Sequence, residues 1–328
     1  MLTIKEIAEM ANVSRSTVSR ALNNSGYVSE DAMERIKKVI AETGYAPSEH
    51  AKSLRTKRTK VIGVILPTIQ TETSSKIVAG IDKELSTQGY QILLANTNLD
   101  KAKEIEYVDL LKARQVDGII LVATNTDPLL LKKIKGLTIP IVIIGQEMEG
   151  LVNVLYDDYH ASRELTSFLI EKGHRKIAFI GVDEEDRAVG FLRKKGYKDE
   201  MIAHKLSIEP AWIQKGIFDI DSGRQAMDQI WTTSQNKPTA AFAVTDRLAI
   251  GALSFLKDHK ISVPEQMAIA SIGASEISQY VDPPLTTIDY QNEKAGKEAA
   301  HQLLTNIGTK AAIKKIILDY RLIIRDSV

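Results

Sequence analysis

The sequence contains no cysteine, few aromatic residues and no long apolar run. Without cysteine the chain has no disulfide, no thiolate metal site and no Cys nucleophile, so its sequence gives no sign of an oxidising compartment. No apolar run approaches the roughly 18 residues that a membrane-spanning helix needs. The opening residues, MLTIKEIAEM, carry charge every few positions and lack the apolar stretch of a secretion signal. These absences predict a cytoplasmic protein that contacts no membrane.

The distribution of charge separates the first sixty residues from the rest. With 328 residues the chain predicts two or three domains, and its 26% of charged residues is typical of globular proteins. Residues 1–60 hold eleven Lys and Arg against seven Asp and Glu, a balance of +4, whereas the remainder holds 32 against 35. Residues 52–60, KSLRTKRTK, include five basic side chains and no acidic one. This segment suits a polyanion such as nucleic acid, or alternatively forms a solvated linker.

Short helices are indicated within the first sixty residues. Thr3 and Glu6 fit a capping box, in which each side chain bonds to the other residue's backbone amide at a helix start. Ser14 suits the N-cap of a second helix and Ser29 that of a third, which ends near Gly44. The first helix has apolar residues at the spacing of a buried face: Ile4, Ile7, Ala8 and Ala11. The third has a similar stripe: Ala32, Ile36, Val39 and Ile40. The pattern predicts a three-helix bundle.

The second of these helices has two unlike faces. At about 100° per residue, its polar and basic side chains gather on one side. They are Arg15, Ser16, Ser19 and Arg20. The opposite side is mostly apolar and comprises Thr17, Val18, Ala21 and Leu22. A rigid helix with two guanidinium groups and two hydroxyls on its outer face predicts a surface that reads DNA bases.

The N-terminal sequence as a whole is similar to a known family. It reads TIKEIAEMANVSRSTVSRALNNSGYVSEDAMERIKKVIAETGYAPSEHAKSLRTKRTKVIGVILP. The succession VS..TVSR.LN, then GY.P, then A.SL resembles the headpiece and hinge of the LacI/GalR family of bacterial repressors. The resemblance implies a lambda-repressor-like helix-turn-helix headpiece at 1–47, a hinge helix and linker at 48–59, and an effector-binding and dimerisation core at 60–328.

The resemblance also implies which residues contact operator DNA. The second helix would enter the major groove, where an arginine can pair with guanine in bidentate fashion. A leucine at the position of Leu54 would wedge into the minor groove from a hinge that folds only on DNA. The implied DNA-binding residues are Thr3, Ser14, Arg15, Ser16, Arg20, Asn23, Ala51 and Leu54. As alternatives, Arg15 and Arg20 contact phosphates without reading bases, and Leu54 is an exposed linker residue.

From Val61 onward, short apolar runs alternate with helical patterns. Strands are expected at 61–66, 92–95, 118–123, 141–145, 154–158, 176–181, 239–244 and 267–273. Helices are expected around 74–88, 101–115, 159–172, 221–231, 247–258 and 291–306. Fully apolar strands separated by helices predict parallel sheets covered on both faces, here an α/β core of two doubly wound subdomains. The final segment 314–326 should cross between them. The expected subdomains are about 60–157 plus 288–318, and about 158–287 plus 319–328.

The motifs of common enzymes are missing from the chain. GxxxxGK[ST], GxSxG, HExxH and GxGxxG do not occur. His174 lies between a helix end and a strand, where a structural role is expected. The run Asp183 to Asp186 lacks the spacing of a calcium loop, so it is interpreted as a solvated loop or helix start. We expect no enzyme, no metal site and no cofactor.

The remainder of the chain resembles the periplasmic-binding-protein-like core of the same family. Ligands of such folds bind beyond the carboxyl ends of the strands, in a cleft between two lobes. The positions that match the family's effector pocket are Thr71, Ser74, Gln146, Arg193, Phe218, Thr245, Asp246 and Ser275. A purely structural role is the alternative for each. Ser275 stands where many members have the carboxylate that binds sugar hydroxyls, so their sugar specificity does not carry over.

Within the family, the segments PIVIIGQEMEGLVNVLYDDYHASREL and GVDEEDRAVGFLRKKGY look most like repressors of sucrose operons, with trehalose regulators next. The expected partners are a pseudo-palindromic operator, a sugar or sugar phosphate that acts as inducer, and a second copy of the chain. The chain ends without an appended leucine heptad segment, so we expect a homodimer. A catabolite-control regulator activated by a phosphoprotein, a sugar-phosphate regulator of the trehalose type, and a sugar-transport receptor are the alternatives.

Overall fold

The computed structural model describes residues 2–23, 25–45, 58–309 and 313–328. The chain divides into two compact units, Met1–Lys60 and Val61–Val328, which are considered separately. The predicted hinge contacts Ala51 and Leu54 lie outside the described residues.

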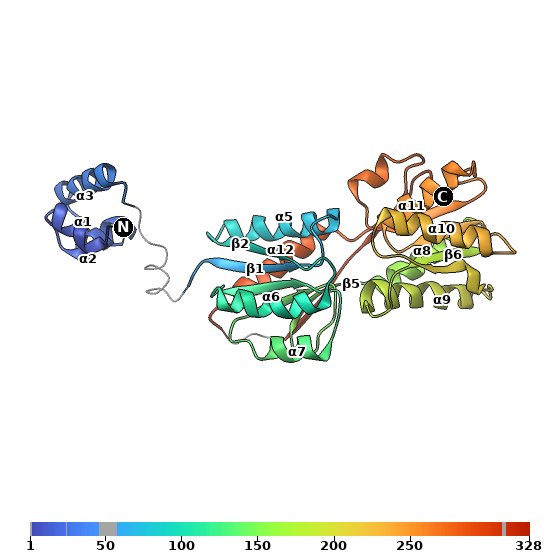
Figure 1. Ribbon diagram of the computed structural model, residues 1–328, viewed down its shortest axis with the longest axis horizontal. Helices are drawn as coiled ribbons and strands as arrows, with labels where there is room; N and C mark the ends of the chain where they lie inside the picture. Colours follow the sequence, from blue (N-terminus) through green and yellow to red (C-terminus); the bar gives the residue numbers. More distant parts are fainter. Residues whose placement is uncertain (1, 24, 46–57, 310–312) are drawn as a thin grey trace. The chain divides into compact units, whose positions relative to one another are not determined.

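The first unit is a bundle of three helices (Figure 1). They are α1 (Ile4–Met10), α2 (Arg15–Asn23) and α3 (Glu30–Thr43). The capping box of Thr3 and Glu6 is present, Ser29 caps α3, and Gly44 ends it in the left-handed conformation. Apolar side chains from all three helices form the core: Ile7, Ala8, Ala11, Val18, Ile36 and Val39. The structure therefore confirms the predicted bundle and its caps.

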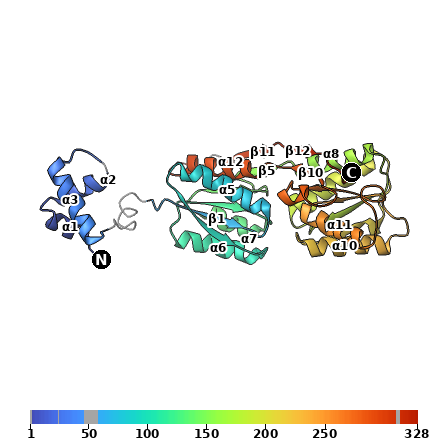
Figure 2. The ribbon, with the colours of Figure 1, turned by 90° about the horizontal axis from the view of Figure 1, so that it is seen from above.

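The second unit contains two six-stranded sheets, one in each of two lobes (Figures 1 and 2). The first-lobe sheet has the order β11-β5-β4-β3-β1-β2, and the second-lobe sheet has the order β12-β10-β9-β8-β6-β7. All strand pairs are parallel except β10 with β12. The first-lobe strands are β1 (Val61–Leu66), β2 (Gln91–Asn96), β3 (Gly118–Val122), β4 (Ile141–Ile144), β5 (Val152–Tyr156) and β11 (Lys314–Leu318). The second-lobe strands are β6 (Ile177–Gly181), β7 (Ile213–Lys215), β8 (Ala240–Ala243), β9 (Ala268–Ile272), β10 (Thr286–Asp289) and β12 (Arg321–Ile323).

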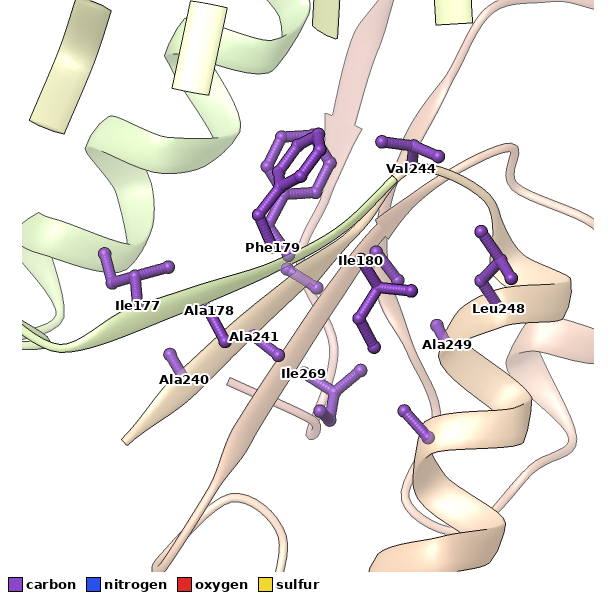
Figure 3. Packing of buried hydrophobic residues seen from close by; sticks show 14 of the residues in the cluster. Ile177, Ala178, Phe179, Ile180, Ala240, Ala241, Val244, Leu248, Ala249 and Ile269 are labelled. Carbon is purple, nitrogen blue, oxygen red and sulfur yellow. The ribbon is translucent and has the colours of Figure 1, made fainter. Parts of the chain in front are cut away.

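Helices cover both faces of each sheet, as the apolar strands require. In the first lobe one face packs against α5 (Glu72–Ser86) and α12 (Asn292–Asn306), and the other against α6 (Lys101–Ala113) and α7 (Pro128–Lys135). The second lobe has α8 (Asp158–Glu171) and α9 (Arg193–Ala203) on one side and α10 (Ile220–Thr233) and α11 (Asp246–Asp258) on the other. Figure 3 shows part of this second core, where Phe179 and Leu248 flank the sheet.

Glycine allows α5 and α12 to touch backbone to backbone. A Cβ at Gly80 of α5 would lie 1.9 Å from the Glu293 carbonyl oxygen, and one at Gly296 of α12 would lie 2.0 Å from the Ile77 carbonyl oxygen. No other residue type fits at this crossing without moving a helix.

The expected strands are all present, with ends that differ by at most two residues. Sequence reasoning missed α7, β7, α9 and β10, and also the π-helical turn Arg187–Leu192 that precedes α9. β7 has only three partly exposed residues, and α9 (RKKGYKDEMIA) is polar around a central glycine. The sequence of β10, TTID, is buried although it is polar, because its threonines find hydrogen-bond partners. Short or polar elements of this kind give no clear periodic signal.

The chain passes between the lobes three times. The first crossing follows β5, the second joins β10 to α12, and the third lies between β11 and β12. The crossing expected within residues 314–326 is therefore present, since β11 and β12 belong to different sheets.

Candidate functional site

The outer face of α2 carries the residues that the sequence assigns to DNA. Arg15, Ser16 and Arg20 are exposed, whereas Val18 on the opposite face is fully buried. Ser14 Oγ accepts a hydrogen bond from the Thr17 amide at 3.1 Å, which caps the helix. The cap and the buried face fix α2 on the bundle, so the two guanidinium groups project from a rigid support.

Two other predicted DNA contacts have local partners. Thr3 Oγ1 takes part in the capping box of α1. Asn23 Nδ2 donates a hydrogen bond to the Ser19 carbonyl oxygen at 2.5 Å. Both residues are exposed.

A cavity that is partly open to solvent lies between the two lobes. It is bounded by the carboxyl ends of strands in both sheets, which is where ligands of doubly wound folds bind. All eight predicted effector-binding residues line it. Thr71, Ser74 and Gln146 come from the first lobe, and Arg193, Phe218, Thr245, Asp246 and Ser275 come from the second. The fold therefore brings together residues that are up to 204 positions apart in the sequence.

At one wall of the cavity, Arg193 is held in a buried ion pair. Its Nε donates to Asp158 Oδ1 at 2.6 Å, and its Nη1 donates to the Val244 carbonyl oxygen. The guanidinium also lies 5.2 Å from the centre of the Tyr290 ring. Asp158 and Tyr290 line the cavity as well, and sequence reasoning missed both. The guanidinium is thus oriented before any ligand arrives.

Asp246 connects three segments of the second lobe. Its Oδ1 accepts hydrogen bonds from Ser271 Oγ at 2.6 Å and Thr287 Oγ1 at 2.7 Å. Its Oδ2 accepts from the Ser275 amide at 2.6 Å and from Ser275 Oγ at 2.7 Å. Because four donors occupy its two oxygens, the Asp246 carboxylate fixes the positions of these segments beside the cavity.

Two threonines that line the cavity, one from each lobe, cap helices. Thr71 Oγ1 accepts from the Ser74 amide at the start of α5, and Thr245 Oγ1 accepts from the Leu248 amide at the start of α11. Thr71 Oγ1 also donates to Ser74 Oγ at 3.1 Å. Phe218 has a left-handed backbone, with φ of 70°, and presents an aromatic ring at the cavity after β7.

A buried hydrogen bond joins the two lobes across the cavity. Gln146, which follows β4, donates from Nε2 to Asp186 Oδ1 at 2.7 Å, and Asp186 follows β6. The two residues are only 2% and 8% exposed. Asp186 also accepts from the Val189 amide at 2.9 Å. Burial raises the pKa of the Asp186 carboxyl above its ordinary range.

The sequence predicts that the run Asp183 to Asp186 is a solvated loop or a helix start, and Asp186 is buried at the start of a helical turn. The three preceding acids are exposed and pair with lysines, Asp183 with Lys215, Glu184 with Lys194 and Glu185 with Lys101. Asp186 turns inward because its side chain caps the π-helical turn that leads into α9. The pair of Glu185 with Lys101 also joins the lobes, since Lys101 begins α6.

Further contacts between the lobes lie near α5. Lys76 Nζ donates to the Ala274 carbonyl oxygen at 3.3 Å, and the Glu276 amide donates to Glu72 Oε2 at 2.5 Å. Arg247 Nη1 donates to the Gln70 carbonyl oxygen at 3.4 Å. These bonds hold the lobes together beside the cavity.

The described residues contain no group of three His, Asp or Glu side chains that could hold a metal ion. His174 Nδ1 lies 3.0 Å from Thr239 Oγ1, a contact between two loops that agrees with a structural role. Within the same part of the chain, no helix is both long and apolar enough to cross a bilayer.

Comparisons with known proteins give a family match for each part of the chain. Residues 3–48 match the family described as bacterial regulatory proteins, lacI family, and residues 166–328 match a periplasmic binding protein-like domain. The chain is 32% identical over 334 residues to the HTH-type transcriptional repressor PurR of Haemophilus influenzae (strain PittEE), which covers 100% of this chain and 99% of the relative.

Solved structures give the same picture. The fold is similar to that of the transcriptional regulator CelR in complex with cellobiose, with a TM-score of 0.75 and 27% identity over 100% of both chains. It also resembles the lac repressor dimer bound to operator and the anti-inducer ONPF, with a TM-score of 0.89 over 99% of this chain and 98% of that chain. At 23% identity the second likeness supports the fold alone. The chain therefore belongs to the lacI family of bacterial regulatory proteins and is a DNA-binding transcriptional repressor.

Proposed function

We propose that the protein represses a carbohydrate-utilisation operon and that a sugar bound in the interlobe cavity relieves this repression. The observation that supports the proposal most directly is that the eight predicted effector-binding residues line one cavity. They come from both lobes, so a ligand there can have different affinities for open and closed arrangements of the lobes. Such a difference is what any effector needs to shift a conformational equilibrium.

On the DNA side, Arg15, Ser16 and Arg20 read bases in the major groove, and Leu54 wedges into the minor groove. The exposure of the first three on a capped, well-packed helix favours this role. Two copies of the chain present two such helices, which matches a pseudo-palindromic operator. We therefore propose a homodimer that acts in the cytoplasm, where its operator is.

Lobe closure links the two sites. A sugar in the cavity favours one arrangement of the lobes, which alters the separation of the two hinges in the dimer. A coupling of about 1–3 kcal/mol gives roughly 5- to 150-fold changes in operator affinity.

The proposed inducer is sucrose, its phosphate or fructose. The similarity to CelR, whose structure contains cellobiose, favours a carbohydrate but not sucrose in particular. The relatives named PurR give no support for sucrose. A purine nucleobase therefore belongs in the test beside the sugars.

The test is binding of duplex DNA from upstream of the protein's own and neighbouring genes, measured by fluorescence anisotropy at fixed salt. Sucrose, sucrose phosphate, fructose, trehalose phosphate and a purine nucleobase are added one at a time. We expect one sugar to lower the affinity for a specific duplex. Tighter binding with the nucleobase and no response to sugars would contradict the proposal. A response that needs an added phosphoprotein would indicate the catabolite-control alternative.

A further inference from the structure

The interlobe cavity gathers buried polar atoms that lack hydrogen-bond partners. Among the described residues, four buried side-chain polar atoms make no hydrogen bond, and three of these line the cavity. They are Glu72 Oε1, Gln146 Oε1 and Arg247 Nε. Glu72 Oε1 lies 2.5 Å from Lys76 Nζ, so its charge is paired. Because buried polar groups are nearly always hydrogen-bonded, Gln146 and Arg247 indicate groups that a ligand completes.

The orientation of Gln146 defines what it needs. Its amide nitrogen donates to the Asp186 carboxylate at 2.7 Å, so its Oε1 is directed elsewhere and remains an acceptor. The residue is only 2% exposed. A ligand group that satisfies Oε1 must donate a hydrogen bond, which a hydroxyl can do and an unprotonated phosphate oxygen cannot.

Arg247 has the opposite requirement. It stands at the start of α11 in the second lobe, and its Nε is a donor without an acceptor. Gln146 belongs to the first lobe. Since a hydroxyl both donates and accepts, a ligand with several hydroxyls can satisfy Gln146 and Arg247 from opposite lobes.

The charges around the cavity decide between neutral and anionic ligands. Four carboxylates line it, Glu72, Asp158, Asp186 and Asp246, against the guanidinium groups of Arg193 and Arg247. Arg193 is already paired with Asp158, and Glu72 is paired with Lys76, so Asp186 and Asp246 are the lining carboxylates that remain. This leaves Arg247 as the only lining cation without a carboxylate partner among the described residues. A phosphate dianion would meet an excess of negative charge in a partly desolvated site, which opposes its binding.

We propose that the effector is a neutral polyhydroxyl compound that donates to Gln146 Oε1 and accepts from Arg247 Nε, and that Asp186 disfavours phosphorylated sugars. The inference rests on the proposed function, because it takes the cavity as the effector site. Asp186 would then contribute to specificity, and the protein would prefer each neutral sugar to its phosphate ester.

Matched pairs of ligands test the inference by calorimetry with the full-length protein. The pairs are sucrose, fructose, glucose and trehalose, each against its phosphate ester. We expect at least one neutral sugar to bind and its ester to bind at least about tenfold more weakly. An ester that binds as tightly as its parent overturns the inference, and so does a panel in which no neutral sugar binds.

Variants assign the effect to the two residues. Gln146→Met keeps the size of the side chain and removes its amide, so binding of the neutral sugar should fall by about tenfold or more. Asp186→Asn keeps acceptors for Gln146 and Val189 while it removes the charge, so the preference for the neutral sugar over its ester should shrink. Glu184→Gln, on the exposed part of the same loop, is the matched control and should change neither. An unchanged preference in Asp186→Asn contradicts the role of this carboxylate, even if Gln146→Met does not fold.

Operator binding in the same samples separates this inference from the proposed function. If a neutral sugar binds but operator affinity does not change, the regulatory proposal fails and the ligand class stands. If only a phosphate ester releases the operator, the regulatory proposal stands and the ligand class is wrong.

Discussion

Arg193 Nε donates a 2.6 Å hydrogen bond to Asp158 Oδ1, and this ion pair joins the start of α9 to the start of α8. The side chains of the two residues are only 7% and 2% exposed. Tyr290 donates to the same Asp158 oxygen at 3.1 Å, so one carboxylate holds both Arg193 and Tyr290 beside the cavity. Removal of its charge leaves a cation buried without compensation.

Asp158→Asn should therefore destabilise the protein strongly. We expect the free energy of unfolding to fall by about 3–5 kcal/mol, as measured by urea denaturation. Asp109→Asn is the control, because Asp109 is 53% exposed in its pair with Lys133 and should cost less than about 1 kcal/mol. An equal loss of unfolding free energy in the two variants would show that burial of the Arg193 pair does not increase its contribution to stability.

The resemblance to the family supplied the predicted effector residues, and the positions of most of them after strands explain why they meet. The carboxyl ends of parallel strands meet at one edge of a sheet, so Gln146 after β4, Thr245 after β8 and Ser275 after β9 had to lie near the cleft. Arg193 and Phe218 rest on the resemblance alone, since β7 and α9 were not predicted.

Sequence reasoning could not identify the partners of these residues. Asp158 lies 35 positions from Arg193 and 132 from Tyr290, and no local pattern indicates such pairings. Asp186 looked like its three exposed neighbours, because the direction of its side chain depends on a π-helical turn that periodicity does not predict. Contacts between distant segments are set by packing, which one sequence does not reveal.

The crossing of α5 and α12 gives a second test of stability. Alanine normally favours a helix over glycine by about 1 kcal/mol, so Gly80→Ala would be stabilising if only helix propensity mattered. A Cβ at this position would lie 1.9 Å from the Glu293 carbonyl oxygen, and backbone must move to admit it. We expect a net loss of about 1–3 kcal/mol in urea denaturation.

Gly136→Ala is the matched control for this substitution. Its Cβ would lie no closer than 3.4 Å to the Lys133 carbonyl oxygen, and its φ of −85° suits any residue. The change in unfolding free energy should stay within about 1 kcal/mol. A Gly80→Ala protein as stable as this control would contradict the close helix contact.

Buried Glu104 should make stability depend on pH. Its carboxylate accepts from Thr124 Oγ1 at 2.9 Å and Asn125 Nδ2 at 2.6 Å, yet burial raises its pKa from 4.5 to about 7. Between these two values the folded protein binds more protons than the unfolded chain, so the contribution of Glu104 to stability falls as pH rises from about 4.5 to 7. The total fall is about 3 kcal/mol at most.

Urea denaturation from pH 4.5 to 8 measures this contribution. Glu104→Gln does not titrate and should lose this part of the pH dependence, whereas Glu106→Gln, an exposed residue of the same helix, should keep it. Parallel pH profiles for wild type and Glu104→Gln would show that the buried carboxyl has no raised pKa.

Arg20 tests the proposal that α2 recognises DNA. The residue is exposed on the polar face of a helix that Ser14 caps, so Arg20→Ala should leave the headpiece folded and remove one guanidinium from the interface. If Arg20 pairs with a guanine, operator affinity should fall by about 1–3 kcal/mol, and discrimination at one base position should relax.

A contact with phosphate would give a different result. Affinity would then fall for every sequence alike, and the slope of log affinity against log salt would decrease by about one. Arg35→Ala on α3, where Arg35 pairs with Asp31 at 3.0 Å, is the control in the same unit and should bind operator like wild type. Anisotropy titrations at several salt concentrations, with the operator and with single-base variants of it, separate the two kinds of contact. Full operator affinity in Arg20→Ala would contradict the assignment of this face of α2 to DNA.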